Sequence, residues 1–179
     1  MINHSGGASG SDITWENEGL EYGVDTIAYS FQGHNQKSKN QKILTPEELE
    51  IGWENIKIAD KSLHRGLNRT EYIKNLLSRN YYQVKNSDCI FAIGYIASDN
   101  KVKGGTGWAV QMAIDVGKPV YIFDQTENHW FIYLAPKFVK YYDVPKLTGN
   151  FAGIGTRQIT EDGINAIKEI YSVNFSEIT

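Results

Sequence analysis

The stretch KGGTGWAVQMAID, residues 103–115, and the segment VGKPVYIFD that follows it, residues 116–124, decide the fold class. The short apolar segment 88–94 precedes them and has the length of a buried strand. After the glycine-rich turn, apolar residues recur on one face of a helical pattern, and a second apolar strand follows the Gly-Lys-Pro turn. Strand, glycine turn, helix and strand form a βαβ unit, whose crossover makes the two strands parallel.

The glycine turn of this unit, residues 104–107, lies where a helix begins. Free N–H groups and the positive end of the helix dipole attract an anion there, most often a phosphate. Glycine lets the backbone approach such a ligand closely, but it also serves an ordinary tight turn between a strand and a helix. The turn alone leaves both interpretations open.

The beginning of the chain repeats the pattern. A short strand over Met1–His4 leads into SGGASGSD, residues 5–12, and a helix is expected from about Asp12 to Tyr22, with Gly23 after its end. A strand is expected over Thr26–Phe31. The chain therefore contains a second candidate phosphate loop.

The remaining pattern predicts one α/β domain over residues 1–179, with three layers: a mostly parallel, Rossmann-like sheet flanked by helices. Thr45 as N-cap, followed by Pro and two Glu, predicts a helix to about Leu63. Further elements are expected as helices over Thr70–Lys85 and Thr160–Tyr171, a strand over Phe151–Ile154, and two strands, or a strand and a loop, within Trp130–Tyr142.

Composition argues against several classes of protein. A formal net charge of −3 argues against a nucleic-acid partner that is bound through overall positive charge. No apolar run approaches the about 18 residues that span a membrane, and no signal peptide follows Met1, so we expect a cytoplasmic protein without a membrane partner. Cys89 is expected in the core, and the scattered histidines have no metal-ligand spacing. We expect neither a metal nor a cofactor.

Several motifs together resemble a known family. Residues 5–12 are similar to the SGGAxGxD signature of the DNA-processing protein A family, and Arg79-Asn80 resembles its RN pair. Phe151–Arg157 looks like its opening strand with the G-[ST]-R turn. Residues 104–111 match the GGxGTxxE motif of the LOG-type nucleotide phosphoribohydrolases in register. Both groups belong to the SLOG superfamily of nucleotide-ligand-binding domains, and the resemblance covers most of the chain outside residues 33–68 and 129–143.

Two departures from the family pattern matter. The family's first strand and helix correspond here to residues 151–175, at the end of the chain, which a circular permutation explains. The LOG-type catalytic glutamate is Gln111, which cannot carry negative charge or act as a base. The resemblance therefore favours binding over hydrolysis, and whether the protein is an enzyme stays open.

We expect the glycine turns at 5–12, 104–107 and 153–157 to converge on one anionic crevice that binds a phosphorylated nucleoside or a nucleotide-derived signal, for sensing or sequestration. Arg79, Thr106 and loop N–H groups would hold phosphate, and Asp12 or Gln111 would hold ribose. The predicted ligand-binding residues are Ser5, Gly6, Gly7, Ser9, Gly10, Asp12, Arg79, Asn80, Gly104, Gly105, Thr106, Gly107, Gln111 and Arg157.

Alternatives remain. One is N-glycosidic hydrolysis of nucleoside monophosphates, with Asp115 or Asp12 replacing the glutamate; another is single-stranded DNA binding. The polar segment 33–42 is either a solvated loop or a mobile loop over the site, from which His34 could reach the ligand. The aromatic stretch 130–142 is interpreted as an oligomer interface or a sheet edge, and the first interpretation predicts a dimer or higher homo-oligomer.

Overall fold

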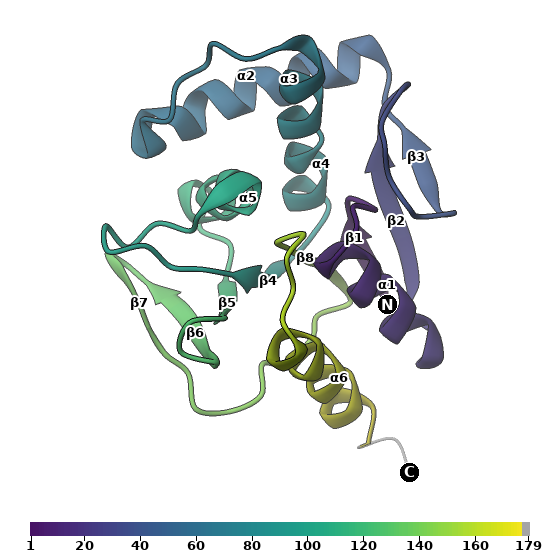
Figure 1. The fold of residues 1–179 in the computed structure, drawn as a ribbon, viewed down its shortest axis with the longest axis vertical. Helices are drawn as coiled ribbons and strands as arrows, with labels where there is room; N and C mark the ends of the chain where they lie inside the picture. The colour runs from purple at the N-terminus through teal and green to yellow at the C-terminus, as the bar shows by residue number, and fades with distance from the viewer. Residues whose placement is uncertain (177–179) are drawn as a thin grey trace.

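The computed structural model describes residues 1–176, so the last three residues of the predicted 1–179 domain lie outside the described residues. One eight-stranded sheet runs in the order β3-β2-β1-β8-β4-β5-β6-β7 (Figure 1). Neighbouring strands are parallel from β3 to β5, whereas the β5–β6 and β6–β7 pairs are antiparallel. The expected α/β fold with a mostly parallel sheet is confirmed. The strands are β1 Ile2–Ser5, β2 Asp25–Ser30, β3 Gln41–Ile43, β4 Cys89–Gly94, β5 Val120–Asp124, β6 His129–Leu134, β7 Lys137–Lys140 and β8 Asn150–Gly155.

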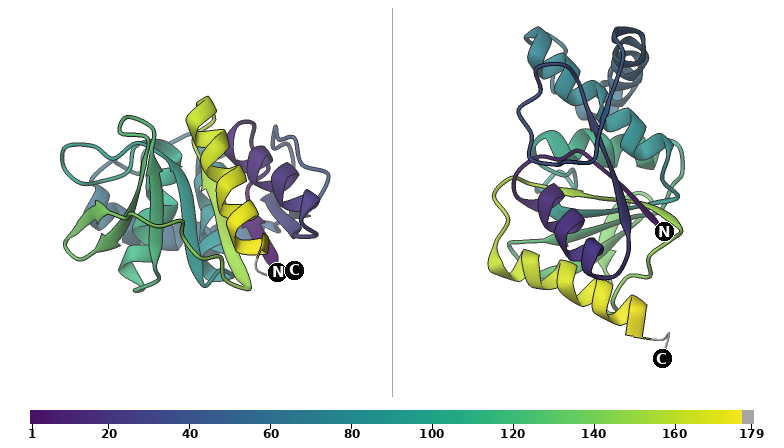
Figure 2. Two further views of the ribbon diagram at one scale, coloured as in Figure 1. Left: turned by 90° about the horizontal axis from the view of Figure 1, so that it is seen from below. Right: turned by 90° about the vertical axis from the view of Figure 1, so that its right-hand side faces the viewer.

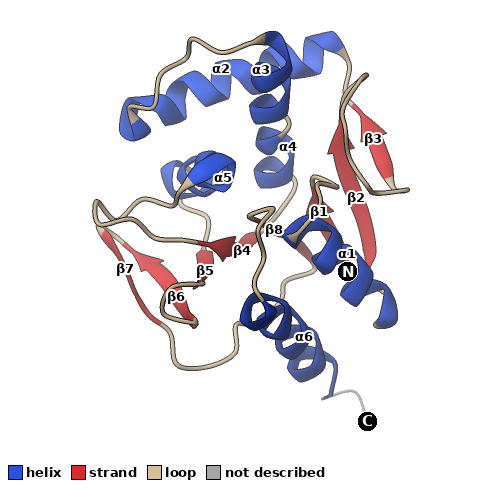
Figure 3. Cartoon of the chain, viewed as in Figure 1, coloured by secondary structure: helices blue, strands red, loops and turns tan. Residues whose placement is uncertain are grey.

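Helices cover both faces of the sheet (Figures 2 and 3). Helices α1 and α6 pack against each other on one face, and α2, α4 and α5 pack together on the other, with α3 against α2. The helices are α1 Ser11–Glu21, α2 Pro46–Leu63, α3 Glu71–Ser78, α4 Asn80–Lys85, α5 Gly104–Asp115 and α6 Glu161–Phe175.

Local sequence signals explain several helix ends. The Thr45 hydroxyl accepts a hydrogen bond from the Glu48 N–H while the Glu48 side chain accepts one from the Thr45 N–H, which completes a capping box at the start of α2. Thr160 caps α6 by accepting from the Gly163 N–H. Gly23, just after α1, has a φ of 71°, which suits glycine at a helix end.

The core has two halves because successive residues of a strand face opposite sides of the sheet. In β4, Ile90 and Ala92 face the α2 and α5 side, whereas Phe91 and Ile93 face the α1 and α6 side. Trp15 and Trp108 are both buried, one in each half of the core. Cys89 is also buried, and burial raises the pKa of its thiol to about 12, so it is an inert core residue.

The structure corrects two expectations about the middle of the chain. The predicted helix Thr70–Lys85 is two helices, α3 and α4, which meet at Arg79. The predicted loop 33–42 ends in the edge strand β3, which adds to β2 in parallel. Neither feature has a local sequence signal, because both follow from packing against distant parts of the chain.

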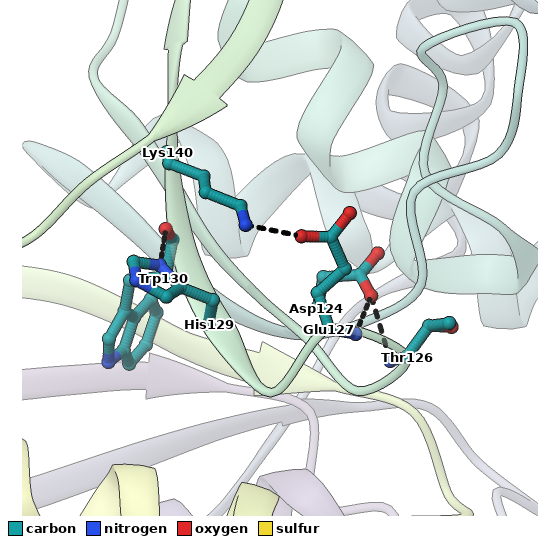
Figure 4. A network of polar contacts seen from close by, with 6 residues as sticks. All are labelled: Asp124, Thr126, Glu127, His129, Trp130 and Lys140. Carbon is teal, nitrogen blue, oxygen red and sulfur yellow. Dashed lines mark hydrogen bonds and ion pairs between the residues drawn. The ribbon is translucent and has the colours of Figure 1, made fainter.

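The other edge of the sheet is the β6–β7 hairpin, so the sheet-edge interpretation of the aromatic stretch is confirmed. A turn stabilised by Asp124 connects β5 to this hairpin: its carboxylate accepts from the N–H groups of Thr126 and Glu127 at 2.8 and 3.0 Å (Figure 4). Glu127 and Lys140 form an exposed ion pair beside it. None of the described helices is long and apolar enough to cross a membrane.

Gly153, in the middle of β8, packs against Trp15 and Asn3, and a substitution there tests these contacts. A Cβ atom there would lie 2.6 Å from the Trp15 indole and 2.9 Å from the Asn3 Oδ1. We expect Gly153→Ala to lower the free energy of unfolding by about 1–3 kcal/mol through overpacking. Urea denaturation measures this effect. Gly149→Ala, where a Cβ meets nothing within 4 Å, is the control, and equal losses in both variants would contradict the explanation.

Candidate functional site

A cavity of about 320 Å³ opens at the carboxyl ends of the central strands β1, β8 and β4. The chain leaves β1 toward β2 on one side and leaves β4 toward β5 on the other, so the cavity lies where the direction of the connections changes (Figure 1). Open parallel sheets bind ligands at such a point. The lining residues are Ala8 and Asp12; Leu76, Leu77, Arg79, Asn80 and Gln83; Lys103, Gly104, Gly105, Thr106 and Ala109; and Ile154, Gly155, Thr156, Arg157 and Gln158.

The three glycine turns therefore converge, as expected, but they contribute unequally. From the first turn only Ala8 and Asp12 line the cavity, whereas Ser5, Gly6, Gly7, Ser9 and Gly10 do not. From the second, Gly104, Gly105 and Thr106 line it and the buried Gly107 does not. The third supplies Gly155, Thr156 and Arg157. Arg79 and Asn80 complete the predicted residues that line the cavity.

Three residues of the first turn hold the third turn in place. The Ser5 hydroxyl donates to the Gly153 carbonyl at 2.7 Å, and both the N–H and the hydroxyl of Ser11 donate to the Thr156 carbonyl. Gly10, with a φ of 88°, lies directly against the backbone of Arg157, where a Cβ would collide. These contacts explain Ser5, Gly10 and Ser11 without a ligand.

Arg79 is the most unusual residue of the cavity. Its side chain is 6% exposed, and its Nε and Nη1 atoms are buried with no hydrogen-bond partner in the described part of the chain. The guanidinium lies against Gly6, where any Cβ would displace it. Burial lowers the Arg79 pKa, and the negative charge of Asp12 partly opposes this shift. A buried, unpaired cation is costly, and an anionic ligand would offset that cost.

Asp12 is the acidic residue of the cavity lining. It is 5% exposed, and its Oδ2 accepts from the Ala8 N–H at 3.3 Å. Burial raises the pKa of the Asp12 carboxyl to about 6, although the charge of Arg79 and the N–H groups of Ala8 and Gly155 favour the ionised form. Within residues 1–176, Asp12 and Arg79 form no ion pair closer than 4 Å, so neither neutralises the other directly.

The start of α5 forms the opposite wall. Its N-cap Lys103 provides no side-chain cap, and the first-turn N–H groups of a helix have no acceptor within the helix. The Arg65 guanidinium donates to the carbonyls of Val102 and Gly104, and Asn80 Nδ2 donates to the Gly105 carbonyl. Side chains from other segments thus donate to the carbonyl groups at the start of α5. The cavity lining carries Arg79, Lys103 and Arg157 against the single acid Asp12, which suits an anion.

The two remaining predicted residues of α5 lie outside the cavity. Gln111 Nε2 donates to Asp115 Oδ1 at 2.8 Å, and neither residue lines the cavity. Asp115 is exposed near the far end of α5. The expectation that Gln111 holds the ribose, and that Asp115 replaces the missing glutamate, therefore has no support from their positions.

The segment 33–40 folds back over the first glycine turn. The Lys37 N–H donates to the Gly7 carbonyl at 2.7 Å, and Ser38 and Asn40 side chains donate to Glu16 Oε1 on α1. His34 lies in this segment, stacked on Phe31, with its Nδ1 2.8 Å from the Ser30 hydroxyl. Burial lowers the His34 pKa to about 3, and the positive charges of Arg79 and Arg157 contribute.

Sequence reasoning missed other lining residues, including Gln83, Lys103 and Gln158, because no motif includes them. Lys103 was adjacent to a recognised turn, so its position at a helix start was the available signal. Within residues 1–176, no group of three His, Cys, Asp or Glu side chains is arranged to hold a metal ion.

Comparisons with models of known families, with curated proteins and with solved structures find no match for this chain. The resemblance of its motifs to the SLOG superfamily therefore stays a prediction.

The low pKa of His34 predicts a pH effect on stability. In the unfolded chain a histidine takes up a proton near pH 6.5, whereas folded His34 stays neutral to about pH 3. Its contribution to stability is therefore full above pH 6.5 and is lost as the pH falls from 6.5 toward 3. We expect His34→Asn, which can keep a bond to Ser30, to lose less stability than the wild-type protein between pH 7.5 and pH 5.

Urea denaturation at both pH values measures the difference. The exposed His64, at the left-handed C-cap of α2, offers a matched control, because asparagine tolerates that conformation. Equal pH slopes for the wild-type protein and His34→Asn would contradict the burial of a neutral imidazole.

Proposed function

We propose that this protein binds a phosphorylated nucleoside, or a signalling molecule derived from a nucleotide, in the cavity around Arg79. The observation that carries the proposal is the buried Arg79 guanidinium, which lines the cavity and has no hydrogen-bond partner for two of its nitrogens. Guanidinium is the side-chain group best suited to phosphate, because it donates in a planar, bidentate geometry. The helix start at 104–106 would add N–H donors to the same anion.

Two further observations support a nucleoside as the rest of the ligand. The cavity volume of about 320 Å³ lies at the small end of the range of about 300–1,000 Å³ that is common for small-ligand pockets. The motifs at 5–12, 104–111 and 151–157 resemble those of nucleotide-ligand-binding SLOG domains. Gln111 stands where the LOG-type family has its catalytic glutamate, and it lies outside the cavity. Both facts favour a sensor or sequestering protein over a hydrolase.

Arg79→Met tests the binding site. It keeps a long, flexible side chain but removes the charge and all donors, so we expect at least a hundredfold loss of affinity, or about 3 kcal/mol, for any phosphate-containing ligand. We also expect the unliganded variant to be at least as stable as the wild-type protein, because a buried unpaired charge is removed.

A thermal-shift screen against nucleoside mono-, di- and cyclic phosphates, followed by calorimetry of each positive compound, measures both effects. Arg69→Met, at an exposed arginine that does not line the cavity, is the control. Wild-type affinity in Arg79→Met, or no compound that shifts the wild-type melting temperature, would refute the proposal.

Hydrolysis of the N-glycosidic bond is the second candidate, and Asp12 is the observation that favours it. A buried carboxyl in the cavity with a pKa of about 6 is suited to exchange protons near neutral pH. If this candidate is correct, the protein releases free base from nucleoside monophosphates, and Asp12→Asn abolishes the release while Asp115→Asn leaves it unchanged. Mass spectrometry after incubation distinguishes the two functions, since a binding protein returns its ligand intact.

A further inference from the structure

Gln83 is a second buried polar side chain in the lining of the cavity, beside Arg79. It is 2% exposed and lies on α4 four residues after Arg79, a spacing that makes two side chains neighbours on a helix. The Gln83 backbone carbonyl accepts from the Ser87 hydroxyl, whereas its side-chain amide has no hydrogen-bond partner within residues 1–176. Buried amides are normally paired, so this one indicates a polar group from outside the chain.

Parts of both side chains are open to the cavity. In the described part of the chain, the Nε and Nη1 atoms of Arg79 are sealed from solvent and unpaired, but its Nη2 atom and the two polar amide atoms of Gln83 are not sealed in this way. Gln83 is otherwise almost wholly buried, so its amide belongs to the small part of the residue that faces the cavity. A ligand in the cavity therefore reaches Arg79 Nη2 and the Gln83 amide directly.

The backbone of Gly6 closes the cavity behind these two side chains. A Cβ atom on Gly6 would lie 2.6 Å from Gln83 Nε2 and would collide with Arg79 Nη1, so both side chains pack against this one residue. Gly6 is itself buried and does not line the cavity. A ligand group that reaches Arg79 and Gln83 therefore faces protein backbone, and no further part of the ligand extends past it.

We propose that Gln83 binds the same phosphate as Arg79 and that this phosphate is the terminal group of the ligand, a phosphomonoester. The inference rests on the proposed function and deepens it, because it selects among phosphorylated ligands. A phosphodiester, or an inner phosphate of a longer chain, carries substituents on two sides. The closed end at Gly6 leaves space for a substituent on one side only.

An amide suits this position because it is neutral. Its N–H groups donate to a phosphate oxygen and leave the positive charge of Arg79 uncompensated for the ligand. A phosphomonoester presents three terminal oxygens on the side away from its ester bond, which gives Arg79, Gln83 and the N–H groups at the start of α5 separate acceptors. A carboxylate at residue 83 would instead pair with the guanidinium and repel the phosphate.

Three nucleoside probes separate the position of the phosphate from its charge. AMP is a phosphomonoester and cyclic AMP is a phosphodiester, whereas the sulfate ester of adenosine has a terminal group with three oxygens but, like cyclic AMP, a single negative charge. Titration calorimetry of the full chain compares them, together with their guanine, cytosine and uracil counterparts. For each base that binds, we expect the monophosphate to bind at least about tenfold more tightly than the cyclic nucleotide, and the sulfate ester to bind more tightly than the cyclic nucleotide as well.

Variants of Gln83 test its own contribution. Gln83→Met keeps the length of the side chain and removes the amide, so we expect it to bind monophosphates about tenfold more weakly than the wild-type protein. We expect Gln83→Glu to lose at least about a hundredfold, because its carboxylate pairs with Arg79. Gln41→Met is the matched control, at an exposed glutamine of the edge strand β3 outside the cavity, and its affinity should stay within about twofold of wild type.

The outcomes separate this inference from the proposed function. Loss of binding in Arg79→Met together with wild-type affinity in Gln83→Met would overturn the role of Gln83 and leave the phosphate site intact. A cyclic nucleotide that binds as tightly as the monophosphate or the sulfate ester would overturn the terminal position of the phosphate. Unchanged binding in Arg79→Met, or no binding of any probe to the wild-type protein, would refute the proposed function and this inference with it. Melting temperatures of the unliganded variants show whether Gln83→Met is folded; if it is not, Gln83→Leu replaces it in the same comparison.

Discussion

The arrangement of the site depends on the insertion of β8 between β1 and β4. The Asn3 side chain accepts a hydrogen bond from the Gly153 N–H at 2.8 Å, and the Ser5 hydroxyl donates to the carbonyl of the same residue. Gly153 has no side chain, so Trp15 packs directly over the strand at this point. Because β8 is fixed by polar contacts on one side and by an aromatic ring above it, the turn that follows it has one position relative to α1.

A second constraint is the burial of two charged residues, Arg79 and Asp12, in the lining of the cavity. Arg79 occupies a place that a hydrophobic residue would fill at lower cost, and Asp12 has a carboxyl that burial makes harder to ionise. The two apolar cores on either side of the sheet are extensive enough to stabilise the fold despite this cost. Residues that lower stability and line a cavity are typical of functional sites.

The sequence predicted the features that depend on neighbouring residues. The βαβ units, the capping box at Thr45 and the burial of Cys89 follow from local patterns, and the structure has all three. The convergence of the glycine turns was also predictable, because the carboxyl ends of parallel strands share one edge of a sheet.

What sequence reasoning missed depends on distant contacts or on helix geometry. The break at Arg79 and the strand β3 at the end of segment 33–42 involve no local signal. Gln111 matches a family motif in register, but five residues along a helix correspond to a rotation of about 140° from Thr106. Ala109, three residues from Thr106, lines the cavity, whereas Gln111 does not.

The pairing of β1 with β8 has a consequence for the order in which the site can form. Ser11 and Thr156, which are hydrogen-bonded to each other, are separated by 145 residues, and the first strand has no partner on this side until residue 150 has been synthesised. During translation the N-terminal glycine turn leaves the ribosome early but lacks the strand that positions it. The cavity around Arg79 is therefore complete only after nearly the whole described chain has emerged, and a nascent or truncated chain that ends before β8 would lack one wall of it.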